Sequence, residues 1–299
     1  MKFSITLPRP EGNPDISGFA GFIDLAKAAE RLGFDAVSGS DHPFPLVIEG
    51  EAGHQTYDPF VLLSYVGSAT ERIALHFSLL VAPYRNPFLS ARMLSTLDFA
   101  SGGRVIAAVG AGYLRAEFDA LGADYEGRTA KVDEMVRTMR AAWTGEPVEY
   151  SGSTFRASGN VMLPTPTSKP SPRLWRGGNT DSALRHATMT FDGWAPFEIG
   201  DDGSKQTTTS LMSIDTLAPR MQHLAEMLED SGRSVSFDVC YVRTSRRWLK
   251  DRDTIIEHLQ QLDSVGVTWL EFNISGSNSS EWIDCIEMFA ETARQAGVF

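Results

Sequence analysis

The stretch IALHFSLLVAPYRNPFLSARMLSTLDFASGGRVIAAVGAG, residues 73–112, decides the fold. Residues 73–82 form a nearly continuous apolar run, which is typical of a strand buried on both faces of a parallel sheet. Prolines end this run, and apolar residues then recur with helical spacing until a Ser-Gly-Gly stop after residue 100. Residues 105–109 predict a second buried strand, which leads into Gly110-Ala111-Gly112. The stretch is therefore a strand–helix–strand unit.

The same alternation continues in both directions along the chain. Apolar runs predict eight strands, and helical periodicity separates them: 2–7, 35–40, 73–82, 105–109, 173–176, 193–197, 234–242 and 268–274. Residues 145–165 are punctuated by Gly and Ser and predict a β-hairpin excursion. Eight βα units without a linker predict a single (β/α)8 TIM barrel over residues 1–299, although a doubly wound sheet would show the same alternation.

The composition limits the kinds of partner. A formal charge of −11 argues against nucleic acid or an anionic membrane as the main partner. The two cysteines, Cys240 and Cys285, have no motif spacing and fit a reducing cytosol. No apolar run could span a membrane, and the N-terminus lacks a signal-peptide core. We therefore expect a soluble, cytoplasmic protein that acts on a small molecule.

Asp41 and His42 follow the second predicted strand. A (β/α)8 barrel carries its catalytic groups at the C-terminal ends of its strands. Imidazole titrates near neutral pH, so His42 is suited to proton transfer beside a reacting carbon. The alternative is that Asp41 caps the next segment and that His42 packs in a loop.

Two glycine-containing turns follow other strands. Gly110-Ala111-Gly112-Tyr113 begins like a dinucleotide fingerprint but lacks its third glycine, so we expect it to let a ring system approach the backbone. Arg176-Gly177-Gly178-Asn179 opens a helix, where free N–H groups could bind phosphate, or it is simply a turn that needs glycine. Arg85 is a candidate for binding an anionic tail, with a surface salt bridge as the alternative.

No metal site is expected from the spacing of ligand residues. His42, His54 and His76 lack ligand spacing, and no HxH ends the first strand as it would in a barrel metallohydrolase. Residues 198–211 and 43–56 are long polar loops that follow strands. We expect them to form a lid over the substrate, or else to be idle surface insertions.

Several of these segments resemble the bacterial luciferase-like family, and within it the branch that uses the deazaflavin coenzyme F420. They are SDH at 40–42, VAPYRNP at 81–87, LSTLDFASGGRVIAAVGAGY at 94–113, EFDALG at 117–122, RGGNTDSALRHA at 176–187 and DGW at 192–194. The resemblance implies a (β/α)8 barrel, usually dimeric, with the coenzyme in the C-terminal mouth. It also implies a bulge with a non-prolyl cis peptide at Ser78-Leu79, beneath the ring.

The expected function is therefore that of an F420-dependent oxidoreductase, a homodimer that moves a hydride between the coenzyme and an organic substrate. The alternatives are an FMN-dependent monooxygenase, a non-catalytic flavin-binding member of the family and, remotely, a barrel metallohydrolase. Some relatives that oxidise sugar phosphates carry glutamate where this chain has Tyr113, which argues against that activity. The expected catalytic residues are His42 and Asp41. The expected coenzyme-binding residues are Asp41, Ser78, Leu79, Arg85, Gly110, Ala111, Gly112, Tyr113, Arg176, Gly177, Gly178 and Asn179.

Overall fold

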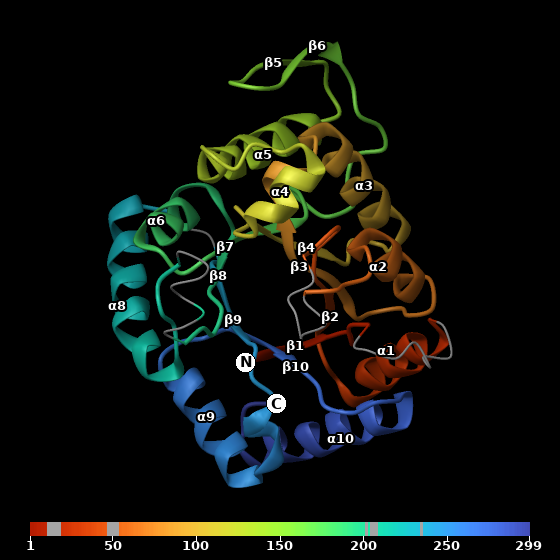
Figure 1. Cartoon of the computed structure of the whole chain (residues 1–299), viewed down its shortest axis with the longest axis vertical. Coiled ribbons are helices and arrows are strands. Elements are labelled where there is room, and N and C mark those ends of the chain that lie inside the picture. The colour runs from red at the N-terminus through yellow and green to blue at the C-terminus, as the bar shows by residue number, and fades with distance from the viewer. Residues whose placement is uncertain (11–18, 47–53, 201–202, 204–208, 234–235) are drawn as a thin grey trace.

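Eight parallel strands close into a barrel in this computed structural model (Figure 1). The structure describes residues 1–10, 19–46, 54–200, 203, 209–233 and 236–299. In chain order the barrel strands are β1 (Lys2–Thr6), β2 (Ala36–Gly39), β3 (Ala74–Val81), β4 (Val105–Gly110), β7 (Arg173–Gly177), β8 (Gly193–Ala195), β9 (Asp238–Arg243) and β10 (Trp269–Asn273). Pairing of β1 with β10, with Ser4 beside Glu271, closes the sheet. The closure confirms the predicted (β/α)8 barrel and rules out a doubly wound sheet.

Helices surround the barrel on its outer side (Figure 1). They are α1 (Ala20–Leu32), α2 (Pro59–Gly67), α3 (Pro87–Ala100), α4 (Arg115–Leu121), α5 (Arg128–Ala142), α6 (Asp181–Thr190), α8 (Ile214–Ser231), α9 (Arg252–Ser264) and α10 (Ser279–Gln295), with 3-10 turns at η1 (Ala82–Tyr84) and η2 (Arg247–Lys250). Side-chain caps fix the first turn of several helices. Asp58, for example, accepts hydrogen bonds from two backbone N–H groups of α2. Among the described residues, no helix is both long and apolar enough to cross a membrane.

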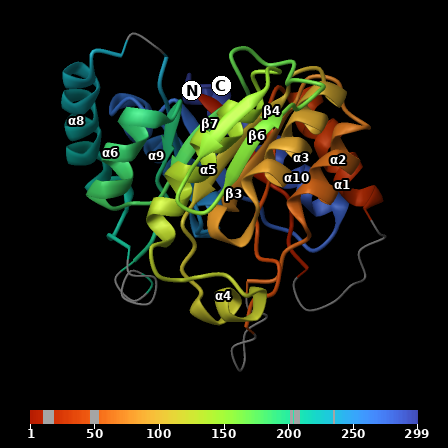
Figure 2. The same ribbon diagram turned by 90° about the horizontal axis from the view of Figure 1, so that it is seen from above.

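A two-stranded hairpin lies outside the helical layer, against α3 and α5 (Figure 2). It consists of β5 (Val148–Ser151) and β6 (Arg156–Asn160), which pair in antiparallel fashion, and it confirms the predicted excursion. Glu134 of α5 holds its turn by accepting hydrogen bonds from the Ser153 hydroxyl and the Thr154 N–H. The hairpin is therefore remote from the C-terminal ends of the barrel strands.

The inside of the barrel is lined by alternate residues of each strand. Ala108, Trp175, Ala195 and Trp269 belong to an apolar cluster inside the barrel, whereas other buried positions of β1, β2, β3 and β10 carry polar side chains. These buried polar side chains are those of Ser4, Thr6, Ser38, His76 and Glu271. Barrel interiors are usually filled by branched apolar side chains, so this group of polar side chains is unusual.

Candidate functional site at the mouth of the barrel

Asp41 is fixed by contacts at the end of β2. Its carboxylate is 2% exposed and accepts a hydrogen bond from the Val81 N–H at 3.1 Å. Arg85 adds two further bonds, from Nε to Oδ2 at 3.2 Å and from Nη2 to Oδ1 at 2.5 Å. Every one of these contacts joins β2 to the end of β3. Asp41 therefore holds the two strand ends together, and this leaves it little capacity for a bound molecule.

His42 follows directly and is held at both its backbone and its ring. Its N–H donates to Thr56 Oγ1 at 3.1 Å, and that hydroxyl donates back to the His42 carbonyl at 3.3 Å. Its ring nitrogen Nδ1 lies 3.2 Å from Glu117 Oε2 of α4. A carboxylate can only accept, so Nδ1 carries the proton in this contact. The other ring nitrogen, Nε2, then has its lone pair free to accept a proton while the ring is neutral.

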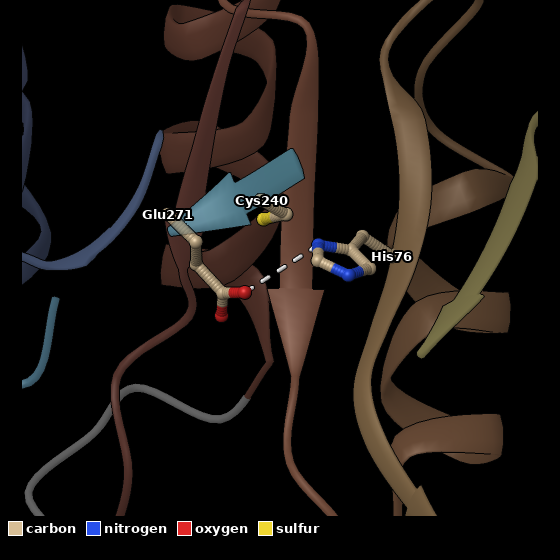
Figure 3. Close-up of side chains that lie close together, drawn as sticks. All are labelled: His76, Cys240 and Glu271. Atoms are coloured by element: carbon tan, nitrogen blue, oxygen red, sulfur yellow. Dashed lines mark ion pairs between the residues drawn. The ribbon is translucent and has the colours of Figure 1, made fainter. Parts of the chain in front are cut away.

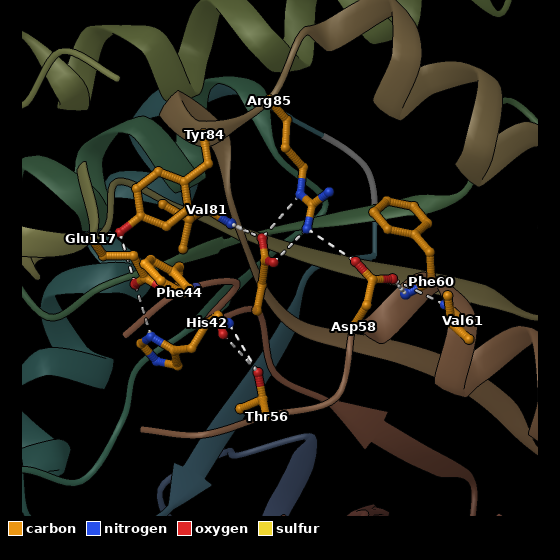
Figure 4. Close-up of polar contacts among 11 residues, drawn as sticks. His42, Phe44, Thr56, Asp58, Phe60, Val61, Val81, Tyr84, Arg85 and Glu117 are labelled. Carbon is orange, nitrogen blue, oxygen red and sulfur yellow. Dashed lines mark hydrogen bonds and ion pairs between the residues drawn. The ribbon is translucent and has the colours of Figure 1, made fainter. Parts of the chain in front are cut away.

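Glu117 is a buried carboxylate with three donors around it (Figure 4). Besides His42, the Phe44 N–H donates to Oε1 at 2.9 Å and the Tyr84 hydroxyl donates to Oε2 at 3.1 Å. Burial alone would raise the pKa of Glu117, but these hydrogen bonds and the charge of His42 together hold it below its ordinary value. Glu117 therefore stays ionised near neutral pH and stabilises the protonated form of His42.

Two more ring side chains lie beside His42. The imidazoles of His42 and His54 are stacked with their centroids 4.9 Å apart. Tyr113 packs edge-on against both rings, and its hydroxyl lies 3.5 Å from His54 Nε2. Burial raises the pKa of Tyr113, so its phenol is neutral at physiological pH. The mouth thus places two imidazoles and a phenol together beside the end of β4.

The floor next to these residues is made by an irregularity in β3. The strand register shifts between Phe77 and Leu80, and the Ser78-Leu79 peptide is cis, as the resemblance implies. A Cβ atom built on Gly110 or Gly177 would lie 2.6 or 2.4 Å from the Leu79 side chain. The two glycines therefore make room for Leu79, rather than for a ligand directly as we expected of Gly110. Leu79 gives the floor an apolar surface.

Arg176 lies behind this floor. The alternation of β7 places Trp175 inside the barrel and Arg176 outside it, where its guanidinium is buried and donates to the Gly177 carbonyl. Burial lowers the pKa of Arg176 to about 10, against the opposing attraction of Asp133. Arg176 thus supports the glycine turn from the helix side of the sheet, which was not apparent from the motif alone.

Asn179 orders the turn that follows. Its side-chain amide donates to the Phe197 and Ser210 carbonyls at 2.8 and 3.1 Å, and its oxygen accepts from the Phe197 N–H. Thr180 caps α6 by accepting from the Ala183 N–H. Gly178, directly before Asn179, has φ +121°, a conformation that other residues rarely adopt. The backbone of this turn is therefore fixed where α6 begins at the mouth.

Comparison with known proteins places this geometry in a family. The model of the luciferase-like monooxygenase family matches residues 1–241. The chain belongs to this family. It is accordingly a luciferase-like oxidoreductase that uses a flavin or a deazaflavin, and F420 and FMN are both used by proteins similar to it.

Similar sequences include members with different coenzymes. An uncharacterized protein of Mycobacterium tuberculosis is 29% identical over 266 residues, 85% of this chain and 84% of that protein. An F420-dependent glucose-6-phosphate dehydrogenase of Nocardia farcinica is 34% identical over 151 residues, 48% of this chain and 44% of that one. An FMNH(2)-dependent dimethylsulfone monooxygenase of Pseudomonas putida is 26% identical over 171 residues, 56% and 46% of the two chains. The chain thus spans about half the length of these last two relatives.

Solved structures share the whole barrel. The monooxygenase RslO1 from Streptomyces bottropensis superposes with a TM-score of 0.81 at 19% identity, and the match covers 99% of both chains. An F420-dependent secondary alcohol dehydrogenase, in complex with an F420–acetone adduct, superposes with a TM-score of 0.79 at 16% identity. That match covers 99% of this chain and 98% of the dehydrogenase. These likenesses establish the fold.

Sequence reasoning missed several residues at the mouth of this luciferase-like barrel. Glu117, Tyr84 and Thr56 contact His42 or its carboxylate partner, yet none was a candidate. The signal available for Glu117 was that it begins EFDALG, one of the segments that resemble the family, although this does not show where its side chain points. Half of the lid predicted at 198–211, and half of its companion at 43–56, lie outside the described residues. At the ends of the 198–211 segment, Ile199 forms an antiparallel bridge with Met212.

Proposed function

We propose that this luciferase-like barrel is an F420-dependent oxidoreductase that transfers a hydride between the deazaflavin ring and an organic substrate. The observation that carries the proposal is the His42–Glu117 pair, which lies at the mouth beside the Ser78-Leu79 bulge. A hydride transfer consumes or creates a proton, and the pair supplies a site for that proton next to an apolar floor suited to a ring system. A member that only stores a flavin would have no need of an ionised carboxylate behind His42.

The likenesses in sequence support F420 over FMN. The F420-dependent relatives are 31–34% identical to this chain over 151–181 residues, whereas the FMNH(2)-dependent relative is 26% identical over 171 residues. The sugar-phosphate activity named for those F420-dependent relatives is not proposed, since Tyr113 here takes the place of the glutamate that such enzymes carry. An FMN-dependent monooxygenase is the second candidate, and the relative from Pseudomonas putida favours it.

Each residue of the mouth would have a separate role in the reaction. The bound deazaflavin supplies hydride chemistry at its ring. His42 Nε2 accepts the proton that a substrate releases on oxidation, or donates it in the opposite direction. Glu117 holds the ring in the tautomer with Nδ1 protonated and stabilises the imidazolium. Thr56 fixes the backbone of His42, and Asp41 with Arg85 fixes the adjacent strand ends.

The coenzyme's phosphate would lie at the turn before α6. We propose that Gly178 and the first N–H groups of α6 bind it, because a helix N-terminus attracts anions. Arg176 would act on this site through the turn, since its side chain lies behind β7. Arg85 is committed to Asp41 and lies 3.6 Å from Asp58, so we assign it to the strand ends and not to an anionic tail.

We also propose that the chain forms a homodimer. Helices α2 and α3 follow one another around the barrel (Figure 1) and expose large apolar side chains. Val61 and Tyr65 of α2 and Leu89 of α3 are 61, 44 and 64% exposed. Covering such residues in a second copy would remove apolar surface from water.

Direct binding tests the proposal. Purified protein is titrated with F420 and separately with FMN, and the change in coenzyme fluorescence gives each dissociation constant. We expect F420 to bind at least about tenfold more tightly, a difference of about 1.4 kcal/mol. A clear preference for FMN would overturn the choice of coenzyme and favour the monooxygenase. Failure to bind either coenzyme would overturn both functions.

A further inference from the structure

Three side chains of metal-binding type meet inside the barrel, below the mouth (Figure 3). His76 comes from β3, Cys240 from β9 and Glu271 from β10, and one ligand atom of each lies within 4.8 Å of the others. All three side chains are buried, with 0, 0 and 1% exposure. Imidazole, thiolate and carboxylate are the groups that bind zinc in proteins. None of the three belongs to the proton-transfer group around His42.

Glu271 leaves one carboxylate oxygen without a partner. Its Oε1 accepts hydrogen bonds from Thr6 Oγ1 at 3.0 Å and Ser38 Oγ at 2.6 Å. Its Oε2 is buried and has no hydrogen-bond partner among the described residues. His76 Nδ1 is 3.6 Å from Oε2, which is too long for a hydrogen bond. A buried carboxylate oxygen in this position is costly unless a cation or a donor satisfies it.

The distances fit two ligands on one ion better than a hydrogen bond. Two nitrogen or oxygen ligands at tetrahedral zinc, with bonds of roughly 2.0–2.1 Å, lie roughly 3.4 Å from each other. His76 Nδ1 is 3.6 Å from Glu271 Oε2 and 3.2 Å from the hydroxyl of Ser4. The three ligand atoms lie within 4.8 Å of one another, so they would have to move closer together around an ion to complete the set. Ser4 or a water molecule would then take the fourth position.

We propose that His76, Cys240 and Glu271 bind one zinc ion or a similar divalent transition metal inside the barrel. A divalent cation, the Cys240 thiolate and the Glu271 carboxylate together have no net charge. Binding of the ion would therefore neutralise the buried carboxylate. A thiol must lose its proton to bind a metal ion, so binding would release the Cys240 proton to solvent. Thr6 and Ser38 orient the carboxylate from behind, as supporting residues do at known metal sites.

The surroundings give the ion a structural role. The His76 ring packs edge-on against Trp175 at 4.8 Å, and Trp175 contacts Trp269 at 5.3 Å, so the site is enclosed by aromatic rings. The three ligands also come from strands that are not all neighbours in the barrel. Going round the sheet from β3, strands β2 and β1 come before β10 and β9. An ion here would tie opposite walls of the barrel together. Its binding requires no coenzyme, so the proposal is independent of the proposed function.

Cobalt substitution tests the site. The full chain, with any purification tag removed, is produced in minimal medium with Co2+ as the added transition metal, and its metal content is measured by mass spectrometry. We expect close to one ion per chain and a near-ultraviolet thiolate-to-cobalt absorption band. Cys240→Ser should remove the band. Cys285→Ser is the matched control, because Cys285 is the other cysteine of the chain and lies outside the cluster, and it should retain both metal and band.

A second variant guards against misfolding. Ser38→Ala removes one hydrogen bond to Glu271 but no ligand, and it should weaken metal binding roughly 10–100-fold. Circular dichroism establishes that each variant is folded before its metal is measured. Wild-type protein with less than about a tenth of an ion per chain overturns the proposal, whatever the variants do. Persistence of the band in Cys240→Ser would overturn it as well.

Discussion

His42 and Glu117 are 75 positions apart in the sequence, yet the Glu117 carboxylate accepts a hydrogen bond from the His42 ring at 3.2 Å. The contact joins the end of β2 to α4, the first helix after β4. The contact uses Nδ1 of His42, so Nε2 is the ring nitrogen that can exchange a proton. A histidine supported in this way resembles a general acid–base group more than a packing residue, and the pair can be tested one member at a time.

Removal of the imidazole should abolish most turnover. We expect His42→Asn to lower kcat on the order of 10²-fold or more, with little change in coenzyme affinity, because it removes a positioned proton-transfer group. His223→Asn is the matched control, since His223 lies on α8 with its side chain 45% exposed. Turnover that is unchanged in His42→Asn would reduce His42 to a packing residue.

Replacement of Glu117 should slow proton transfer. Burial would raise the pKa of the Glu117 carboxylate, but its hydrogen bonds outweigh this effect and hold the pKa below the ordinary value, so Glu117 is ionised beside the His42 ring. Glu117→Gln keeps an oxygen that can accept from His42 Nδ1 but removes the negative charge that stabilises an imidazolium formed during the reaction. We therefore expect kcat to fall about tenfold or more, with little change in coenzyme affinity.

The control for Glu117→Gln is Asp119→Asn. It removes a carboxylate from the same helix, at a solvent-exposed position, and should leave kcat unchanged. An unchanged kcat in Glu117→Gln would show that the charge of Glu117 plays no part in the reaction.

The barrel was predictable because each buried parallel strand appears in the sequence as a short, nearly continuous apolar run. Each of the eight predicted apolar runs overlaps a barrel strand, and the last of the runs, 268–274, contains Trp269–Asn273. The end of a strand is equally easy to locate, which is why Asp41 and His42 could be placed at the mouth. Strand ends and periodicity are local properties, so one sequence suffices to find them.

Partners across the fold were not predictable in the same way. Glu117 sits in a short helix whose sequence gives no sign that its side chain turns inward to His42. Arg85 was equally compatible with a bound anion or with Asp41, and only the tertiary structure brings it to Asp41. The orientation of Arg176 could have been found, since the alternation of a strand places it opposite Trp175. His76, Cys240 and Glu271 come from three separate strands, so spacing gave no indication of their cluster.

The Arg85–Asp41 pair should behave as a coupled unit. Arg85→Met leaves the Asp41 carboxylate buried without its cation and should lower the free energy of unfolding by about 3–5 kcal/mol. Asp41→Asn combined with Arg85→Met removes both charges and should be less destabilising than Arg85→Met alone. Chemical denaturation of the single and double variants measures this coupling. Additive losses would show that the two side chains act independently.

The start of α6 should repel a second anion if it binds the coenzyme's phosphate. Gly178 is a poor position to test this, because its φ of +121° would strain any replacement. Ser182→Asp is better, since Ser182 is exposed in the first turn of α6, where a carboxylate favours the helix dipole. The melting temperature should therefore hold or rise slightly while affinity for the coenzyme falls. Met189→Glu adds the same charge near the other end of α6, where the side chain is 68% exposed, and should leave affinity unchanged. Equal affinity in Ser182→Asp and the wild type would move the phosphate site away from this turn.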